Sequence, residues 1–434
     1  MKTSAAAALR VVTIGSTVLA FVAAAAPKLA AAALRGDDDR RLAVLGDALA
    51  RAALALGPVA VKCAQMISYR RDLLPAALLA PLERLQDAAR GDDEDVTQVL
   101  EAAWQSPPEG VLSSLKESPV AAGSIAVVLR GALQDQAVAV KVLRPGTEKR
   151  VRRDVACLRW LVSCAARFEA CRGIPVLETF DHIAASMLAQ CDLSLEAEHS
   201  ERLRRNLAPY GVVVPRTRAE LVRRSVLVQD YAPSLRKLSP GTVPVDVYRD
   251  CSIRLLRAVY SMIFRDGIIH MDLHPGNVFV TADDRLLLLD AGLVAVLPVS
   301  ERMLFRDFFL GLALGDSAGC ARAIVQSAAR QPKTLDQAAL IEAVEQLVGK
   351  YHGRLAGDFL IADFVYEVFG LQRRFGLYGT PGFVSAIWAL VMFEGLVRHD
   401  FQELDFQAEA RPFFTGRIVE QMRSAMGIGA RASA

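Results

Sequence analysis

Residues 269–278 read IHMDLHPGNV and carry the polar groups from which the rest of the chain can be interpreted. Asp272 stands near one end of this stretch and Asn277 near the other, with the tight reversal Pro275-Gly276 between them. The Asp272 carboxylate can face an attacking group, and the Asn277 amide oxygen can face a metal ion. The stretch therefore predicts a catalytic loop that carries one acid and one metal ligand.

A second carboxylate follows a short apolar run. Asp290 comes directly after Leu286–Leu289, so we expect it just past a strand and close to the same metal ion. Magnesium takes few protein ligands, with phosphate oxygens and water in the other positions, so Asn277 and Asp290 suffice. An Asp-x-x-x-x-Asn loop followed by such an aspartate is typical of kinases and predicts Mg²⁺ with ATP or ADP as cofactors.

Lys141 completes this pattern upstream. It lies in the short apolar run Val138–Val142, which Pro145-Gly146 ends, so a strand is predicted. A lysine on the inward face of such a strand costs free energy unless it is paired with an anion. In a kinase-like lobe the anions are nucleotide phosphates and a helix glutamate. No glycine-rich loop precedes Lys141; the alanine-rich stretch 119–126 stands there, and its Cβ atoms keep the backbone from lying over phosphates as glycines do.

The order of the predicted elements indicates the fold class. Residues 37–114 and 147–208 have helical periodicity, and everything after Pro298 is predicted to be helical. Further strands are predicted at 225–229, 277–280 and 286–289. This order favours an α+β, bilobal protein-kinase-like fold with a helical N-terminal extension. The predicted domains are an apolar segment (1–35), a helical extension (36–115), a kinase-like N-lobe (116–231) and a helical C-lobe (232–434).

Five motifs in this order resemble the UbiB family of atypical kinase-like proteins, which are linked to coenzyme Q and other isoprenoid lipids. They are Gly57-Pro58 to Gln65 with 71–75, the loop Ala121–Ser124, the helix 192–197, the pair 270–277 and 290–292, and the closing segment 393–395 with 404–405. The resemblance spans most of the chain, from about residue 45 to about residue 415.

The resemblance implies a role for each matching residue. Lys62 and Gln65 would lie in an extension that closes over the active site and blocks protein substrates. Asp272 would be the catalytic carboxylate, with Asn277 and Asp290 holding magnesium. The implied nucleotide-binding residues are Ala121, Ala122, Gly123, Ser124, Lys141, Glu196 (paired with Lys141) and Gln229. Such proteins are expected to hydrolyse ATP slowly and to act on an isoprenoid or other membrane lipid, with lipid-biosynthesis enzymes or a second copy of the chain as partners.

The sequence departs from the family pattern at several positions. Ala64 replaces the glycine of the K-x-G-Q motif, Gln190 replaces the first acid of the E-x-D motif, and Ala291 replaces the phenylalanine after the metal-binding aspartate. None of these changes removes a metal ligand. Two alternatives stay open: a small-molecule phosphotransferase of the aminoglycoside or choline kinase type, and a nucleotide-binding pseudokinase that scaffolds lipid enzymes.

The composition indicates which kinds of partner and which cellular compartment to expect for the protein. The net charge of +3 gives no sign of a nucleic-acid partner, and the seven cysteines contain no C-x-x-C pair, which favours a reducing compartment. Residues 1–36 contain no acid, and the charge-free run 11–26 is shorter than the ~20 residues of a comfortable span, with Pro27-Lys28 expected to interrupt it. We expect a membrane-associating helix on the ATP-containing side, with an organellar transit peptide or a cleaved signal as alternatives.

Overall fold

The computed structural model describes residues 5–68, 74–87, 96–116, 118–123, 125–167, 176–274, 276–352, 361–397, 409–410 and 412–413. The chain forms two compact units. Unit 1 comprises Met1–Glu201, Pro215–Tyr231 and Ala291–Leu293, and unit 2 comprises Arg202–Val214, Ala232–Asp290 and Val294–Ala434.

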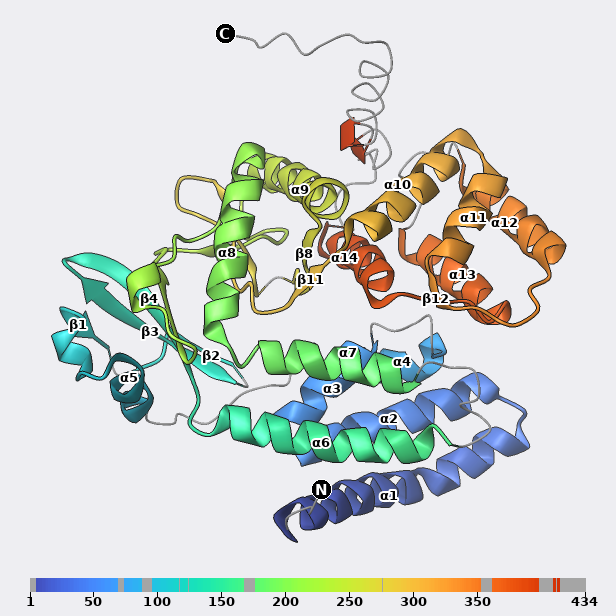
Figure 1. Ribbon diagram of the computed structural model, residues 1–434, viewed down its shortest axis with the longest axis horizontal. Helices are drawn as coiled ribbons and strands as arrows, with labels where there is room; N and C mark the ends of the chain where they lie inside the picture. Colours follow the sequence, from blue (N-terminus) through green and yellow to red (C-terminus); the bar gives the residue numbers. More distant parts are fainter. Residues whose placement is uncertain are drawn as a thin grey trace. The chain divides into compact units, whose positions relative to one another are not determined.

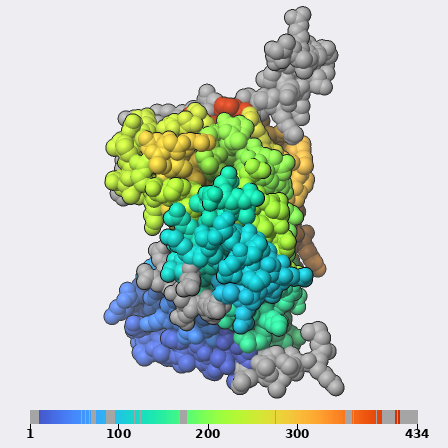
Figure 2. Space-filling view, turned by 90° about the vertical axis from the view of Figure 1, so that its left-hand side faces the viewer, coloured from blue at the N-terminus to red at the C-terminus, as the bar shows by residue number. Residues whose placement is uncertain are grey.

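Helices at the N-terminus of unit 1 pack into one layer, drawn in blue in Figures 1 and 2, and α6 and α7 join this layer from later in the chain (Figure 1). Its members are α1 (Ala5–Leu34), α2 (Asp38–Leu56), α3 (Pro58–Ser68), α4 (Ala76–Glu83), α6 (Thr147–Ala165) and α7 (Val176–Ala189). Asp37 begins α2, because its carboxylate accepts the amide hydrogen of Arg40. Gly57 ends α2 at a φ of +100°, and Pro58 begins α3.

The helix α1 extends past the end of the charge-free run. Pro27 and Lys28 lie inside it, and the helix continues to Leu34. Within the part of the chain that the structure describes, α1 is the one helix that is long and apolar enough, over Arg10–Leu34, to cross a bilayer by length and composition. This property alone does not distinguish a span from a helix that packs against protein.

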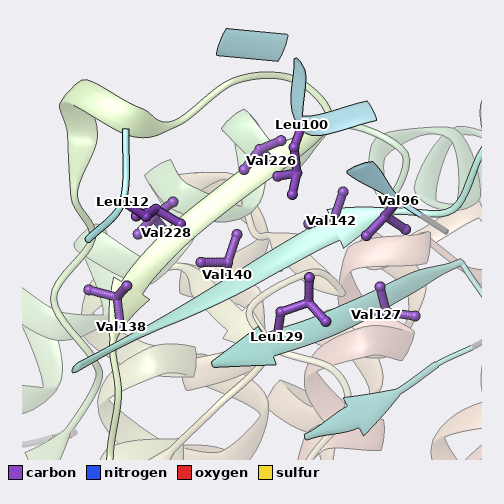
Figure 3. Close-up of a cluster of buried hydrophobic side chains, with 10 residues drawn as sticks. All are labelled: Val96, Leu100, Leu112, Val127, Leu129, Val138, Val140, Val142, Val226 and Val228. Atoms are coloured by element: carbon purple, nitrogen blue, oxygen red, sulfur yellow. The ribbon is translucent and has the colours of Figure 1, made fainter. Parts of the chain in front are cut away.

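An antiparallel sheet forms the second part of unit 1. Its strands run in the order β1 (Ser114–Leu115), β3 (Ala126–Leu133), β4 (Gln136–Leu143) and β6 (Val226–Asp230), and β2 (Ala121–Ala122) also pairs with β3. Val138, Val140 and Val142 alternate along β4 toward a core that α5 (Thr97–Trp104) covers with Leu100 (Figure 3). Lys141 therefore points to the opposite face, where α8 (Leu193–Leu207) begins.

Unit 2 positions the predicted catalytic loop between short strands. β9 (Val278–Val280) and β10 (Leu286–Leu288) form a hairpin flanked by β7 (Arg236–Lys237) and β5 (Val212–Val213), and β8 (Ile268–His270) pairs with β11 (Val294–Val296). The surrounding helices are α9 (Val245–Tyr260), α10 (Val299–Leu314), α11 (Ser317–Gln326), α12 (Gln337–Tyr351), α13 (Ile361–Arg374) and α14 (Pro381–Val397).

The prediction that only helices follow Pro298 is wrong. β12 (Ala328–Arg330) pairs antiparallel with β13 (Tyr378–Gly379). Each strand follows a helix closely and is only two or three residues long, too short for an alternating pattern to identify it.

Candidate functional site

Lys141 forms an ion pair with Glu196 inside unit 1. The Nζ atom lies 2.7 Å from Oε1 and 2.9 Å from Oε2 of the glutamate. The side chains are 17% and 5% exposed, so both charges are largely out of water and each depends on the other. The pair joins the centre of β4 to the first turn of α8, as the resemblance implied for these two residues.

Asp192 explains how α8 holds Glu196 in this place. It precedes the helix, and its carboxylate accepts hydrogen bonds from the backbone amide and the hydroxyl of Ser194. Arg224 lies 3.7 Å from the same carboxylate. The aspartate that remains from the E-x-D pattern thus orders the start of the helix.

The alanine-rich loop is tied to the end of β4 by Arg144. The guanidinium Nε donates to the Gly123 carbonyl at 3.0 Å, and the Arg144 side chain is buried. The Gly123 amide donates to the Ala126 carbonyl at 2.9 Å, so it is already used within the turn. Ala121 and Ala122 lie in β2, and Ser124 lies outside the described residues. Arg144 was not predicted from the sequence, where it reads as an ordinary residue after a strand.

Gln229 lies in β6, where it pairs with Ala139 of β4. The next residue, Asp230, forms an ion pair with Arg218 at 2.6 Å. Gln229 therefore belongs to the edge strand of the same sheet that carries Lys141.

In unit 2, His270 joins the catalytic loop to the end of β10. Its Nδ1 atom accepts the Asp272 amide hydrogen at 3.2 Å, and its Nε2 atom lies 3.1 Å from the Leu289 carbonyl. These contacts fit a neutral ring with its proton on Nε2. Burial lowers the pKa of His270 below its ordinary value, which favours this neutral form.

Asn277 is oriented by the aspartate at the other end of the loop. Its Nδ2 atom donates to the Asp272 carbonyl at 2.9 Å and lies 3.3 Å from Asp272 Oδ2. The amide oxygen of Asn277 is thereby directed away from Asp272. The Leu289 amide donates to the Asn277 carbonyl at 2.9 Å, so Asp290 follows next to Asn277 across the hairpin.

This donor set fits magnesium. Asp290 is exposed and has a φ of +54°, a left-handed conformation that turns the chain sharply at the end of the strand. One amide oxygen and one carboxylate at neighbouring strand ends match a cation that takes few protein ligands. Among the described residues there is no cluster of three or more His, Cys, Asp or Glu side chains of the kind that zinc requires.

His274 is a loop residue whose place the sequence did not predict. Its Nδ1 atom accepts the Gly276 amide hydrogen at 3.0 Å, and its Nε2 atom lies 3.1 Å from Asn277 Nδ2 and 3.6 Å from Asp272 Oδ2. The ring therefore braces the reversal and borders both polar side chains of the loop. Its position within the IHMDLHPGNV stretch was the available signal.

The segment of the K-x-G-Q-like motif is built into the helical layer of unit 1. Gln65 is buried, and its Nε2 atom donates to the Leu85 carbonyl at 2.7 Å. Cys63 Sγ lies 3.2 Å from Met187 Sδ of α7. Lys62 lies in α3, but its side chain is outside the described residues, as are Leu404 and Asp405 of the closing motif.

Comparison with known proteins gives one consistent relationship. Residues 84–324 match the ABC1 atypical kinase-like domain. The chain is 29% identical over 396 residues to "Probable protein kinase UbiB" of Marinobacter nauticus, covering 88% of this chain and 71% of that protein. It is 28% identical to "Probable protein kinase UbiB" of Tolumonas auensis, covering 87% and 71%. Identity to "Uncharacterized protein slr0889" of Synechocystis is 27%, covering 75% and 84%.

A solved structure supports the fold. The complex of Rv3197 with erythromycin from Mycobacterium tuberculosis superimposes with a TM-score of 0.50 over 78% of this chain and 90% of that chain. Sequence identity is 17%, so this likeness concerns the fold alone. The mixed helices and small sheets of the two units agree with the predicted α+β kinase-like class.

Proposed function

The chain belongs to the ABC1 atypical kinase-like family, and from this premise we propose that it is an ATP-binding atypical kinase or ATPase that supports isoprenoid-quinone or related lipid biosynthesis at a membrane. The observation that carries the proposal is the ion pair between Lys141 and Glu196. A buried lysine on a sheet, paired with a helix glutamate, is the arrangement with which kinases hold the nucleotide phosphates.

Lys141 binds nucleotide phosphates in this proposal, and Glu196 fixes the direction of the lysine. The carboxylate of Glu196 contacts Nζ through both oxygens, so it holds the ammonium group in one position and compensates its charge when no phosphate is present. Arg144 holds the alanine-rich turn through the Gly123 carbonyl and so fixes the backbone that precedes β3.

Asp272 accepts the proton of the attacking hydroxyl or water, and Asn277 with Asp290 holds magnesium. When bound, the magnesium ion neutralises the charge that develops on the phosphate oxygens. Asn277 is suited to this because Asp272 already accepts its amide hydrogens, which presents the amide oxygen in a fixed orientation. His270 holds the two ends of the site in register, since it bonds both the Asp272 amide and the Leu289 carbonyl.

Asp290→Asn tests the metal assignment. The change removes the charge of a metal ligand while keeping the size of the side chain, so we expect magnesium-dependent ATP affinity to fall at least tenfold, or ~1.4 kcal/mol. Thermal shift with ATP, with and without magnesium, measures this. Asp283→Asn, an exposed aspartate in the turn of the same hairpin, is the matched control and should bind Mg-ATP like the unaltered protein. Equal magnesium-dependent shifts in the two variants would contradict the proposal.

Turnover and lipid chemistry need separate measurements. Magnesium-dependent ATP binding without release of phosphate would assign the chain to the pseudokinase scaffolds. Lipid profiling of a deletion strain identifies the pathway: loss of one quinone or terpenoid with accumulation of its precursor is expected. An unchanged lipid profile would contradict the role in lipid biosynthesis while leaving the nucleotide site intact.

A further inference from the structure

A short segment that follows α14 in the chain packs onto α9 within unit 2. Of residues 409–413, the structure describes Glu409, Ala410, Pro412 and Phe413, drawn as the short red ribbon near α9 in Figure 1. The carboxylate oxygens of Glu409 lie 2.7 and 3.2 Å from Nε and Nη2 of Arg257 on α9. Ala410 and Phe413 are buried. The 409–413 segment is therefore held by a two-point ion pair and by apolar contacts.

The Phe413 ring lies among two tyrosines and an arginine. Its centroid is 5.9 Å from that of Tyr210 and 5.7 Å from that of Tyr260, within the range in which aromatic rings attract each other. The guanidinium carbon of Arg265 lies 4.8 Å from the centre of the Phe413 ring. Nη2 of Arg265 also donates to the Pro412 carbonyl at 3.3 Å. Arg265 thus holds both the ring and the backbone of the segment.

Arg265 belongs to a π-helical turn. This turn, η6 (Ser261–Asp266), lies between α9 and β8, and the Gly267 amide closes it by donating to the Met262 carbonyl, five residues back, at 2.9 Å. Gly267 itself has a φ of +64° and ends the helix. π-Helical turns are rare and occur frequently at functional sites. The 409–413 segment therefore contacts a part of the backbone that has an alternative, the ordinary α-helical form.

The same turn contacts the catalytic loop on its other side. The His270 amide donates to Met262 Sδ at 3.5 Å. His270 in turn accepts the Asp272 amide hydrogen through Nδ1. One turn of helix thus touches the 409–413 segment through Arg265 and the start of the catalytic loop through Met262.

We propose that the 409–413 segment positions the catalytic loop: Phe413 and Arg265 hold η6 in its π-helical form, and this keeps Asp272 in place for phosphoryl transfer. The inference rests on the proposed function and adds positioning residues that lie outside the motifs of the loop. A return of η6 to α-helical hydrogen bonding would turn its side chains about the helix axis by up to ~100°, the rotation of one residue. Met262 would then leave the His270 amide.

Phe413→Ala tests this proposal. The variant lacks the ring on which Arg265 stacks, so we expect kcat for ATP hydrolysis to fall at least about tenfold. KM for Mg-ATP should change less than about threefold, because the ion pair proposed to hold the phosphates lies in unit 1. Phe375→Ala is the matched control, since its ring also carries an arginine, Arg374, at 5.5 Å, and kcat should be unaltered there. Equal turnover in the two variants, or faster turnover in Phe413→Ala, would overturn the proposal.

The ion pair gives a second and milder test. The Arg257 and Glu409 side chains are 49% and 24% exposed, so replacing them leaves the core beneath α9 intact. Glu409→Arg should lower kcat because it places two cations together, and adding Arg257→Glu should restore most of the loss. A double variant as slow as Glu409→Arg would overturn the positioning role of the segment.

Hydrogen exchange follows the loop without relying on turnover. We expect the amides of residues 262–272 to exchange at least about tenfold faster in Phe413→Ala than in the unaltered protein, and to be unchanged in Phe375→Ala. Unchanged exchange in Phe413→Ala would overturn this inference even in a protein that hydrolyses ATP. Faster exchange in a protein that does not hydrolyse ATP would support the contact between segment and loop while contradicting the proposed activity.

Discussion

The burial of Lys141 and Glu196 allows their contribution to stability to be separated from their chemistry. Lys141→Met alone leaves the Glu196 carboxylate without its ammonium partner at a side chain only 5% exposed. Breaking a buried pair in this way costs about 3 kcal/mol, whereas replacing both partners by apolar residues is often neutral. We therefore expect urea denaturation to show a large loss for Lys141→Met and recovery of most of it in Lys141→Met with Glu196→Leu.

Nucleotide binding should behave differently in the same variants. If the lysine binds phosphates, both the single and the double variant lose ATP affinity, because neither has the ammonium group. Recovery of ATP affinity together with stability in the double variant would show that the pair is only structural.

His270 makes the stability of the protein depend on pH. Its pKa is lowered from the ordinary value of 6.5 because the ring is desolvated by burial. As the pH falls below about 6.5, the unfolded chain takes up a proton on this residue while the folded protein does not, so the free energy of unfolding decreases, by at most about 1.4 kcal/mol per pH unit. Above this pH the contribution of His270 is constant.

His270→Leu isolates this effect. The variant loses the hydrogen bonds to Asp272 and Leu289, so we expect it to be less stable at neutral pH by roughly 1–3 kcal/mol. Its denaturation midpoint should fall less between pH 7 and pH 5 than that of the unaltered protein, since leucine does not titrate. Parallel pH profiles for the two proteins would show that the ring is protonated in the folded state.

At the level of single residues, sequence reasoning found the charged groups but not the residues that orient them. Lys141 and Glu196 could be paired through their resemblance to a known motif. Arg144 and His274 could not be assigned, because their contacts depend on how a turn closes: one on the Gly123 carbonyl and the other on the Gly276 amide. Such contacts leave no periodic signal in a sequence.

At the scale of elements, α2 approaches α4 more closely than a side chain permits. A Cβ atom on Gly46 would lie 2.3 Å from the Leu78 carbonyl oxygen, which is backbone and cannot move independently. Helix propensity alone predicts that Gly→Ala stabilises a helix by about 0.5–1 kcal/mol, but here the steric overlap should dominate. We expect Gly46→Ala to lower the melting temperature.

Gly349 provides the matched control within α12. A Cβ atom there would meet nothing within 4 Å, so Gly349→Ala should raise the melting temperature by the propensity effect alone. Opposite shifts for the two variants would confirm that close packing of α2 on α4 determines the result. Stabilisation in both would mean that α2 and α4 can separate without loss.

The elements themselves were predictable where a pattern was long enough to be read. The strands that became β4 and β6 were placed within two residues of their observed bounds, because runs of β-branched residues end at clear breakers. The helix α1 continues past Pro27 to Leu34, although a proline inside a helix disfavours it locally, and α1 packs against α2 and α6. The pairing of β12 with β13 joins segments far apart in the chain and could not be derived from either one.

At the scale of the whole molecule, the kinase-like class followed from the order of strands, loop and helices, and the family match agrees with it. The sequence did not show that the later helices α6 and α7 pack with the N-terminal helices in unit 1. Each of these segments is amphipathic by itself, and an amphipathic pattern indicates a buried face without naming the partner.

The two polar residues of the K-x-G-Q-like segment, Lys62 and Gln65, should differ in function. Gln65 is buried and donates to the Leu85 carbonyl, so Gln65→Leu leaves that carbonyl unsatisfied and should reduce stability by roughly 1–3 kcal/mol.

Lys62 is the residue that could restrict access to a nucleotide. If the extension suppresses phosphoryl transfer, Lys62→Ala should change ATP hydrolysis or self-phosphorylation at least tenfold, or ~1.4 kcal/mol in the barrier, with little change in melting temperature. Malachite-green phosphate release and autoradiography measure the two activities, and Lys149→Ala, a lysine of α6, controls for the loss of one positive charge. Turnover and nucleotide affinity equal to those of the unaltered protein in Lys62→Ala would exclude a gate at this residue, because a cation that restricts the reaction cannot be removed without altering its rate.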